Sequence, residues 1–202
     1  MDFAIDSSVT SPRIDTRWRA SKHGQDSAQP GTLDLTKFVD GTHYNIGSRT
    51  DNVVPSGVAV EFNSTTGLYE PWNAGAHAAA GTWEATTAYA VGARVKLASG
   101  IVLQATTAGT SGSTAPTAPG AVGGTVTDGT VVWTRQPEAK PIAGFINDDQ
   151  GIDLYRRAGV AKSTTGAFAL LLHGIIEVAQ LPVASQAAAV KAAPSTGSFI
   201  YN

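Results

Sequence analysis

The four histidines are the side chains of this sequence best suited to acid–base or metal chemistry near neutral pH. His23, His43 and His77 are scattered over polar stretches and lack the short spacing of metal ligands. His173 lies in an apolar segment beside Gly174, where a single imidazole is more often a packed residue than a catalyst. The sequence contains no cysteine, which excludes disulfides, thiolate chemistry and Cys-ligated metals. These residues therefore predict no catalytic or metal centre.

The remaining candidate motifs are incomplete. Asp148 and Asp149 follow an asparagine, as in some calcium loops, but the residues after them lack the spacing and the closing glutamate of an EF-hand. The glycine-rich stretch 109–112 lacks the lysine of a phosphate-binding loop, and there is no Gly-x-Ser-x-Gly nucleophile motif. We therefore expect a protein that is not an enzyme and that binds no metal and no cofactor.

Three aromatic residues, Trp83, Tyr89 and Trp133, have the spacing of inward-facing residues on short strands. Two functions fit them. If they stack on sugar rings, they form a glycan-binding platform; if they pack inward, they form the core of a small domain, which needs large side chains. We favour the core, because large aromatic side chains dominate burial, and keep the platform as the alternative.

The composition is that of a weakly charged protein. Only 15% of the 202 residues are charged and the net charge is −2, which does not suit a surface that tracks phosphates, so we expect no nucleic-acid partner. The longest apolar run, 167–176, is too short to cross a bilayer, and no apolar signal sequence is visible, so we expect no membrane partner. So little surface charge suits a protein packed against neighbours.

The elements that position these residues are predicted to be mainly β with minor α structure. Residues 1–30 are polar and contain two prolines, which predicts an extended N-terminal arm. Apolar or alternating runs predict strands, and an alanine-rich stretch with Ser185 as its N-cap predicts a short helix. The expected strands are 32–39, 53–62, 68–72, 142–146, 168–178 and 199–201, and the expected helix is 185–193. We interpret 168–178 as one long core strand bent at Gly174, with a buried helix as the alternative.

Two breaks in composition divide the chain. Residues 73–81 are small and residues 136–141 contain two prolines, so both are predicted to be linkers. Between them, residues 82–136 form a self-contained β pattern with Asp128-Gly129 as a hairpin turn. Because residues 31–72 hold too few strands to close a core, we expect them to form one discontinuous domain with 141–202, interrupted by an inserted small β domain at 82–136.

The inserted segment has two partial resemblances. Its opening resembles the small carbohydrate-binding modules attached to chitinases, in the residues Trp83, Tyr89, Gly92, Val95 and Gly100. Its continuation, 108–133, resembles a β-sandwich or Ig-like module that recurs in tailed-phage structural proteins, and this likeness covers nearly all of the insert. Chitin-binding modules place an aromatic residue soon after the hairpin glycine, where this sequence has Val102 and Leu103, so the resemblance favours the phage module over glycan binding.

The segments on both sides of the insert resemble the lambda-type phage head decoration proteins. The likeness lies in 55–60 leading to 68–72, in 141–146, and in the His-Gly-apolar-apolar pattern of 172–182 that ends in Leu-Pro. It implies a β-tulip-like domain that forms homotrimers at threefold and quasi-threefold positions of the expanded head. Its implied partners are the major capsid protein and other copies of this chain.

The same resemblance implies a location and a mechanism. The protein would lie on the outer surface of the capsid in the virion, after assembly in the host cytoplasm, and would cement the head against the internal pressure of packaged DNA. Its N-terminal arm would lie along the shell and could add a strand to it. The apolar residues expected to make this contact are Ile5, Val9, Ile14 and Trp18.

Two other functions compete with capsid decoration. One is a glycan-binding module that contacts host-surface glycans through the insert, and the other is a tail or baseplate structural protein that uses the same β module. Trimers that bind expanded capsids and not soluble glycans would select decoration.

Overall fold

The computed structural model describes residues 15–77, 80–155 and 162–202. Strands hold 37% of the described residues and helices 12%, which confirms the mainly β class with minor helical content. The contacts divide the chain into two compact units. Unit 1 takes Met1–Trp72 and Pro141–Asn202, and unit 2 takes Asn73–Lys140. Unit 1 thus joins two segments that are far apart in the sequence, and unit 2 contains the segment 82–136 with its flanking residues.

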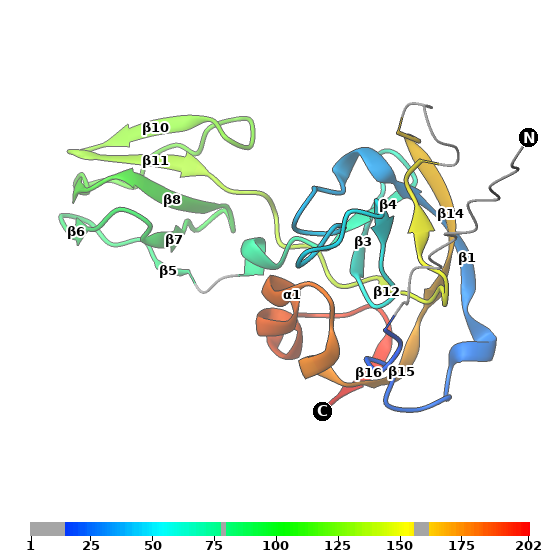
Figure 1. Cartoon of the computed structure of the whole chain (residues 1–202). Coiled ribbons are helices and arrows are strands. Elements are labelled where there is room, and N and C mark those ends of the chain that lie inside the picture. Colours follow the sequence, from blue (N-terminus) through cyan, green and yellow to red (C-terminus); the bar gives the residue numbers. More distant parts are fainter. Residues whose placement is uncertain (1–14, 78–79, 156–161) are drawn as a thin grey trace, which may run out of the picture. The chain divides into compact units, whose positions relative to one another are not determined.

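Unit 1 is built around a closed barrel of five strands in the order β1-β14-β12-β3-β4 (Figure 1). The strands are β1 (Gln29–Asp34), β3 (Ala59–Asn63), β4 (Leu68–Pro71), β12 (Gly144–Ile146) and β14 (Thr165–Leu171). Neighbours are antiparallel except where β1 meets β4 in a parallel pair, Leu33 with Tyr69, and so closes the barrel. Residues from both sides of the insert are therefore interleaved in one sheet.

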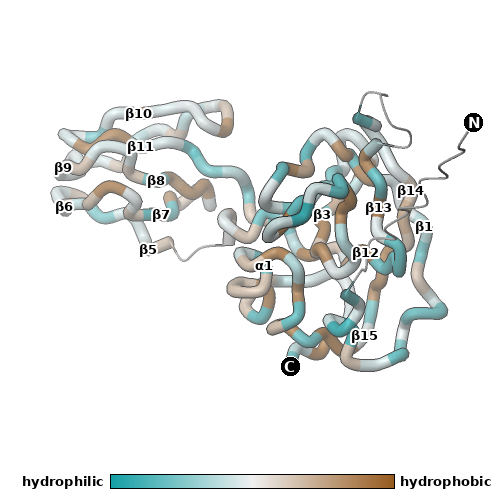
Figure 2. The backbone as a smooth tube through the Cα atoms, viewed as in Figure 1, coloured by the Kyte–Doolittle hydropathy of each residue, from teal (hydrophilic) through white to brown (hydrophobic). Residues whose placement is uncertain are grey.

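The barrel core follows from period-two alternation along its strands. On β14, Phe168 and Leu170 are buried while Thr165 and Ala167 are exposed. Apolar residues that follow β1 complete the core, where the short 3-10 turns η1 (Gln25–Ser27) and η2 (Leu35–Lys37) bracket the strand. Figure 2 shows hydrophobic stretches along the strands of this unit. The core residues are Leu33, Leu35, Phe38, Tyr44, Val54, Val58, Val60, Ile146, Ile152, Leu154, Phe168, Leu170 and Val183.

The strands predicted at 53–62 and 68–72 pair as the antiparallel strands β3 and β4, but the first prediction is only partly right, because the chain turns between Val54 and Ala59. The turn between β3 and β4 closes where the Gly67 amide donates to the carbonyl of Asn63 (2.8 Å), and Gly67 has a φ of 71°, which a residue without Cβ adopts at no steric cost. The predicted strand 32–39 is only partly right, because the chain turns into η2 after Asp34. Two short strands outside the barrel, β2 (Val53–Val54) and β13 (Ile152–Asp153), pair with each other.

The predicted single strand 168–178 is wrong. The chain leaves the barrel after Leu171 and enters a second sheet as β15 (His173–Ile176), so the break lies at Leu172, not at Gly174. The partner of β15 is the C-terminal strand β16 (Ser198–Tyr201), which was expected at 199–201 and runs parallel to β15. The Leu172 carbonyl accepts a hydrogen bond from Ser198 (3.0 Å), which ties the break to the second sheet.

The predicted helix is shorter and starts earlier than expected. A 3-10 turn, η4 (Val178–Gln180), precedes α1 (Ala184–Ala189), and η5 (Val190–Ala192) follows it. Ser185 lies inside α1 and is not its N-cap, a position that Val183 takes. The side chain of Gln186 is 2% exposed. Its amide donates to the carbonyls of Ala59 (2.9 Å) and Trp72 (3.0 Å) and accepts from the Ala59 amide, so α1 is bound to the ends of β3 and β4.

Unit 2 is a five-stranded sheet with the order β10-β11-β8-β7-β5 and a separate two-stranded pair. Residues 73–81 are not only a linker, since they contain the 3-10 turn η3 (Ala74–His77), whose Gly75 carbonyl accepts from Arg94 (2.6 Å). The Asp128-Gly129 hairpin is confirmed between β10 and β11. The sheet strands are β5 (Gly81–Thr82), β7 (Arg94–Lys96), β8 (Val102–Thr107), β10 (Thr125–Asp128) and β11 (Val131–Arg135), and the pair is β6 (Ala88–Tyr89) with β9 (Gly109–Thr110).

Candidate functional site

Trp18 belongs to the core of unit 1. Its side chain is fully buried, its ring stacks on Phe145 with 5.8 Å between centroids, and its indole nitrogen donates to the Ser56 hydroxyl (3.2 Å). The indole lies against Gly57, where any Cβ would come within 2.8 Å of the ring. A side chain that its own chain covers completely cannot also contact a shell, so the expectation that Trp18 is an arm contact is wrong.

Residues 18–20 form a third, strand-like segment of the second sheet, beside β15. The Glu177 amide donates to the Trp18 carbonyl (2.8 Å), and the Ala20 amide donates to the Ile175 carbonyl (3.0 Å). Arg19 pairs with Ile176 as an antiparallel bridge. The order across this sheet is therefore 18–20, then β15, then β16.

Arg19 adds a side-chain anchor to this edge. Its side chain is 9% exposed, and its guanidinium donates to Asn147 (2.6 Å) and to the carboxylate of Asp149 (2.5 Å). Asp148 accepts from the Gln150 amide in a local turn (3.0 Å). In the stretch that could suggest a calcium loop, Asp149 thus forms an ion pair and Asp148 stabilises a turn. Within the described residues no group of three or more His, Cys, Asp or Glu side chains is arranged to hold a metal.

These contacts shorten the predicted arm. Residues 15–28 are attached to unit 1 and β1 begins at Gln29, so the expected boundary at residue 30 is too late. The other arm residues, Ile5, Val9 and Ile14, lie outside the described residues. Sequence reasoning missed the attachment because Trp18 and Arg19 stand in a polar stretch with no apolar periodicity.

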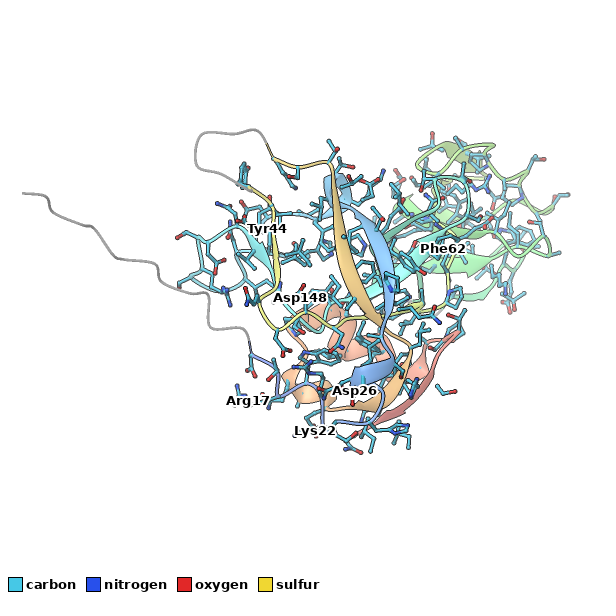
Figure 3. The ribbon with its side chains drawn as sticks, turned by 90° about the vertical axis from the view of Figure 1, so that its right-hand side faces the viewer. Arg17, Lys22, Asp26, Tyr44, Phe62 and Asp148 are labelled. Carbon is cyan, nitrogen blue, oxygen red and sulfur yellow. The ribbon has the colours of Figure 1, made fainter. Side chains whose placement is uncertain are left out.

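The exposed side chains next to the attachment are charged. Arg17 is bound to Asp15 through a bidentate ion pair, and its guanidinium lowers the pKa of the Asp15 carboxyl chiefly through a side-chain hydrogen bond. Figure 3 shows Arg17, Lys22 and Asp26 at the same end of unit 1. The opposite charges are interspersed, so this surface does not form a basic patch.

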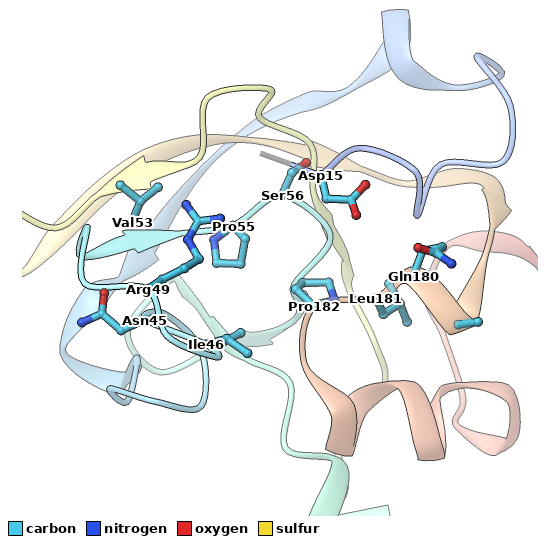
Figure 4. Close-up of a pocket in the computed structure, with 11 residues that line it drawn as sticks. Asp15, Asn45, Ile46, Arg49, Val53, Pro55, Ser56, Gln180, Leu181 and Pro182 are labelled. Carbon is cyan, nitrogen blue, oxygen red and sulfur yellow. The ribbon is translucent and has the colours of Figure 1, made fainter. Parts of the chain in front are cut away.

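A cavity of about 280 Å³ lies where the described chain begins (Figure 4). Asp15 forms part of its wall, and the residues that follow β15, from Ala179 to Pro182, form another part. Its other lining residues, Asn45, Ile46, Arg49, Val53, Pro55 and Ser56, mix apolar and polar groups. Asp15, the first described residue, therefore lies at the end of the second sheet where β15 ends.

The three histidines whose side chains are described have packing and hydrogen-bond contacts within unit 1. The rings of His23 and His173 meet edge to face with 5.0 Å between centroids, and the His173 ring lies 3.3 Å from the Ser27 hydroxyl, without an acidic partner among the described residues. His43 accepts a hydrogen bond from the Val39 amide at Nδ1 (3.0 Å), and burial lowers its pKa to about 4. The side chain of His77 lies outside the description.

Unit 2 is organised around Asp128, which is 4% exposed. One of its carboxylate oxygens accepts from the indole nitrogens of both Trp83 (2.8 Å) and Trp133 (3.0 Å). The other oxygen accepts from the Gly112 amide (2.7 Å). Sequence reasoning assigned this aspartate only to the hairpin turn. The signal for its wider role was the presence of two tryptophans, each with one N–H group that burial obliges to find an acceptor.

The three aromatics named from the sequence meet in this cluster. Trp133 is fully buried, the Tyr89 ring contacts it edge to face at 5.0 Å, and Trp83 and Tyr89 are partly buried against the same core. The Tyr89 hydroxyl accepts from the Glu84 amide (2.9 Å). Because Trp133 has no free face, it cannot stack on a sugar ring.

No described helix has the length and apolar character needed to cross a membrane. Comparisons with protein-family models, with curated proteins and with solved structures found no match to this chain.

Proposed function

We propose that this protein is a non-catalytic capsid decoration protein that binds the expanded phage head as a homotrimer and stabilises it against internal pressure. The proposal starts from the sequence resemblance of 55–72, 141–146 and 172–182 to lambda-type decoration proteins. In this proposal unit 1 is the β-tulip-like decoration domain and unit 2 is an inserted β-sandwich or Ig-like module. The closed barrel of unit 1, assembled from both flanking segments, supports this assignment.

The observation that carries the proposal is the attachment of residues 15–20 to the second sheet. Trp18 and Arg19 hold the start of the described chain against β15, so residues 1–14 are joined to unit 1 at a fixed point. A segment held at one end can be aimed at a neighbouring surface and can add a strand to it. Ile5, Val9 and Ile14 are the apolar residues that this arm offers to the major capsid protein.

Exposed apolar residues on unit 1 support association with other copies. Val39 is 54% exposed and Phe62 is 45% exposed, and neither belongs to the barrel core. With few charges and no disulfides, this unit is suited to gaining stability from an interface. We therefore propose trimers around local threefold axes on the outer surface of the virion.

The test uses expanded heads that carry no decoration protein. The full chain should bind at saturation with three copies around each local threefold in a cryo-EM map. A variant that lacks residues 2–14 should keep its fold, since Trp18 and β1 remain, but should lose occupancy. Single copies, rings of six, or full occupancy by the truncated variant would contradict the proposal.

A glycan-binding role for unit 2 is the competing function. The partial exposure of Trp83 and Tyr89 leaves them as its only aromatic candidates among the three named from the sequence, because Trp133 is buried. Binding of the full chain to immobilised glycans, lost in Tyr89→Ala, would support this role; no binding together with decorated heads would favour the capsid.

A further inference from the structure

The outer edge of β16 carries unpaired backbone groups. The amides of Ser198 and Asn202 donate to the carbonyls of Leu172 and Ile176 (3.0 and 2.9 Å), which places them on the side of β15. Alternate residues of a strand direct their N–H and C=O groups to opposite edges. Those of Phe199 and Tyr201 therefore point away from β15. Within the described part of the chain, no backbone hydrogen bond reaches them and β15 is the only strand paired with β16.

The open edge of β16 is short but lacks two other features that protect open strands, proline and charged side chains. Ser198–Tyr201 contains no proline and no charged residue. Ile200 is 64% exposed and lies in register with Ile175 of β15, so the two form an apolar row that ends at the open edge. A hollow lined by residues of both strands lies beside it. An added strand with apolar residues at every second position would continue this row.

The described chain begins at the end of this sheet where β15 and β16 end. Residues 18–20 run antiparallel to β15, so the chain before them leads toward the C-terminal end of β15. Asp15 shares its cavity with Ala179–Pro182, and the Val178 amide donates to the carbonyl of Asn202. Asp15, the first described residue, therefore lies at the end of the sheet where β16 also ends.

The sequence of this segment has the matching pattern. Phe3, Ile5 and Val9 are apolar residues on one face of an extended strand, with Ser7 between them, and are followed by Pro12, which cannot donate to a sheet. From the outer edge of β16 to the position of residues 18–20, the chain must cross three strand spacings, about 14 Å. Residues 10–14 can span about 17 Å when extended. The connection is therefore long enough within one molecule.

We propose that in the free protein residues 3–9 bind the outer edge of β16 of their own chain as a parallel strand. The direction follows from the crossover, because residue 9 must lie near the end of β16. The same chain is favoured over a second copy because a short tether gives an effective concentration in the millimolar range. This inference concerns the free protein and does not depend on the proposed capsid function.

Amide hydrogen exchange on the full chain tests the proposal, with matched variants. Ile5→Asp/Val9→Asp places charge on the face expected to meet Ile200, and Ala4→Asp/Ser8→Asp places the same charge on the opposite face. We expect the Phe199 and Tyr201 amides to exchange at least about tenfold faster in the first variant than in the wild type and the second. The Ser198 and Asn202 amides, which are bonded to β15, should not change and report that the sheet is intact.

A spin label gives an independent measurement, because the chain has no cysteine and Ser7→Cys is a unique attachment point. The label should broaden the resonances of β16 in its own molecule. When the spin-labelled variant is mixed with isotope-labelled wild-type chains that carry no spin label, the β16 resonances of the wild-type chains should not broaden. Fast exchange of Phe199 and Tyr201 in the wild type, equal protection in both variants, or broadening between molecules would each overturn the proposal.

Discussion

The two units stabilise their cores by different means. Unit 1 has an apolar core in which the barrel strands contribute alternate aliphatic and aromatic residues. Unit 2 has fewer buried residues, and its two tryptophans are joined through the carboxylate of Asp128. A small domain buries a smaller fraction of its surface and gains less from packing alone. The comparison indicates that hydrogen bonds to one buried carboxylate can hold large aromatic rings in place in a core that is too small to hold them by packing alone.

The largest effects should come from the buried tryptophan of each unit. Trp133→Ala and Trp18→Ala should each destabilise their own unit by about 3–5 kcal/mol, the usual cost of removing a large buried aromatic side chain. Hydrogen exchange followed by mass spectrometry reports peptides of both units separately. Trp133→Ala should expose 82–136 and leave the barrel strands protected, and Trp18→Ala should do the reverse. Equal loss in both units from either change would show that the cores are not independent.

Removing the acceptor in unit 2 should have a slightly smaller effect. Asp128→Ala leaves two indole N–H groups and the Gly112 amide without their partner, at a cost of about 2–4 kcal/mol. Asp128→Asn is the matched control, because it keeps one oxygen acceptor at nearly the same size. Thermal unfolding of the three proteins should rank wild type, Asn and Ala in falling order of stability. If the alanine variant is as stable as wild type, Asp128 does not organise this core.

Among the buried polar residues of unit 1, Gln186 offers a direct counterpart to Asp128. Gln186→Ala removes three hydrogen bonds to the ends of β3 and β4, at a cost of about 1–3 kcal/mol. Gln186→Glu keeps the size and the acceptor but loses the two donated bonds. Denaturant unfolding of unit 1 should rank both variants below wild type. An unchanged midpoint for Gln186→Ala would mean that α1 is held by packing alone.

Near neutral pH the smallest effect is a dependence of the stability of unit 1 on pH. The pKa of His43 is lowered to about 4 from its ordinary 6.5 because the ring is buried. Between these values the unfolded chain binds a proton that the folded chain does not, so stability is full above about pH 6.5 and falls as the pH decreases toward 4. Denaturant unfolding at several pH values should show a shallower dependence for His43→Gln, which keeps an acceptor for the Val39 amide. If the stability of wild type and of His43→Gln changes equally with pH, His43 is not the cause of the dependence.

Local signals predicted much of this fold. The turn closed by Gly67 and the Asp128-Gly129 hairpin depend on neighbouring residues, and both are visible in the sequence. The break at Leu172 was missed because the apolar run continues through it, and only the pairing of β15 with β16 divides it. Trp18 was assigned to an arm because its neighbours are polar, whereas its burial depends on Gly57 and Phe145, which are distant in the chain.

The candidate site was less predictable than the fold. Trp83, Tyr89 and Trp133 were correctly grouped by spacing, but the acceptor that joins the two indoles lies in a turn and gives no periodic signal. The open edge of β16 could not be foreseen either, since a strand's neighbours are set by tertiary topology and not by its own residues. Hydrogen-bonding partners that are distant in sequence account for most of what was missed.

The pairing around Val60 has a consequence for how this gene could change. Val60 lies between Pro71 of β4 and Gly144 of β12, so the points where the chain leaves and re-enters the barrel are two strand spacings apart, about 10 Å. Of the 72 residues between Pro71 and Gly144, the 68 that form unit 2, Asn73–Lys140, amount to a single connection from β4 to β12. Any module with closely spaced ends could replace it, which would allow recombination to exchange what the protein carries without rebuilding the barrel.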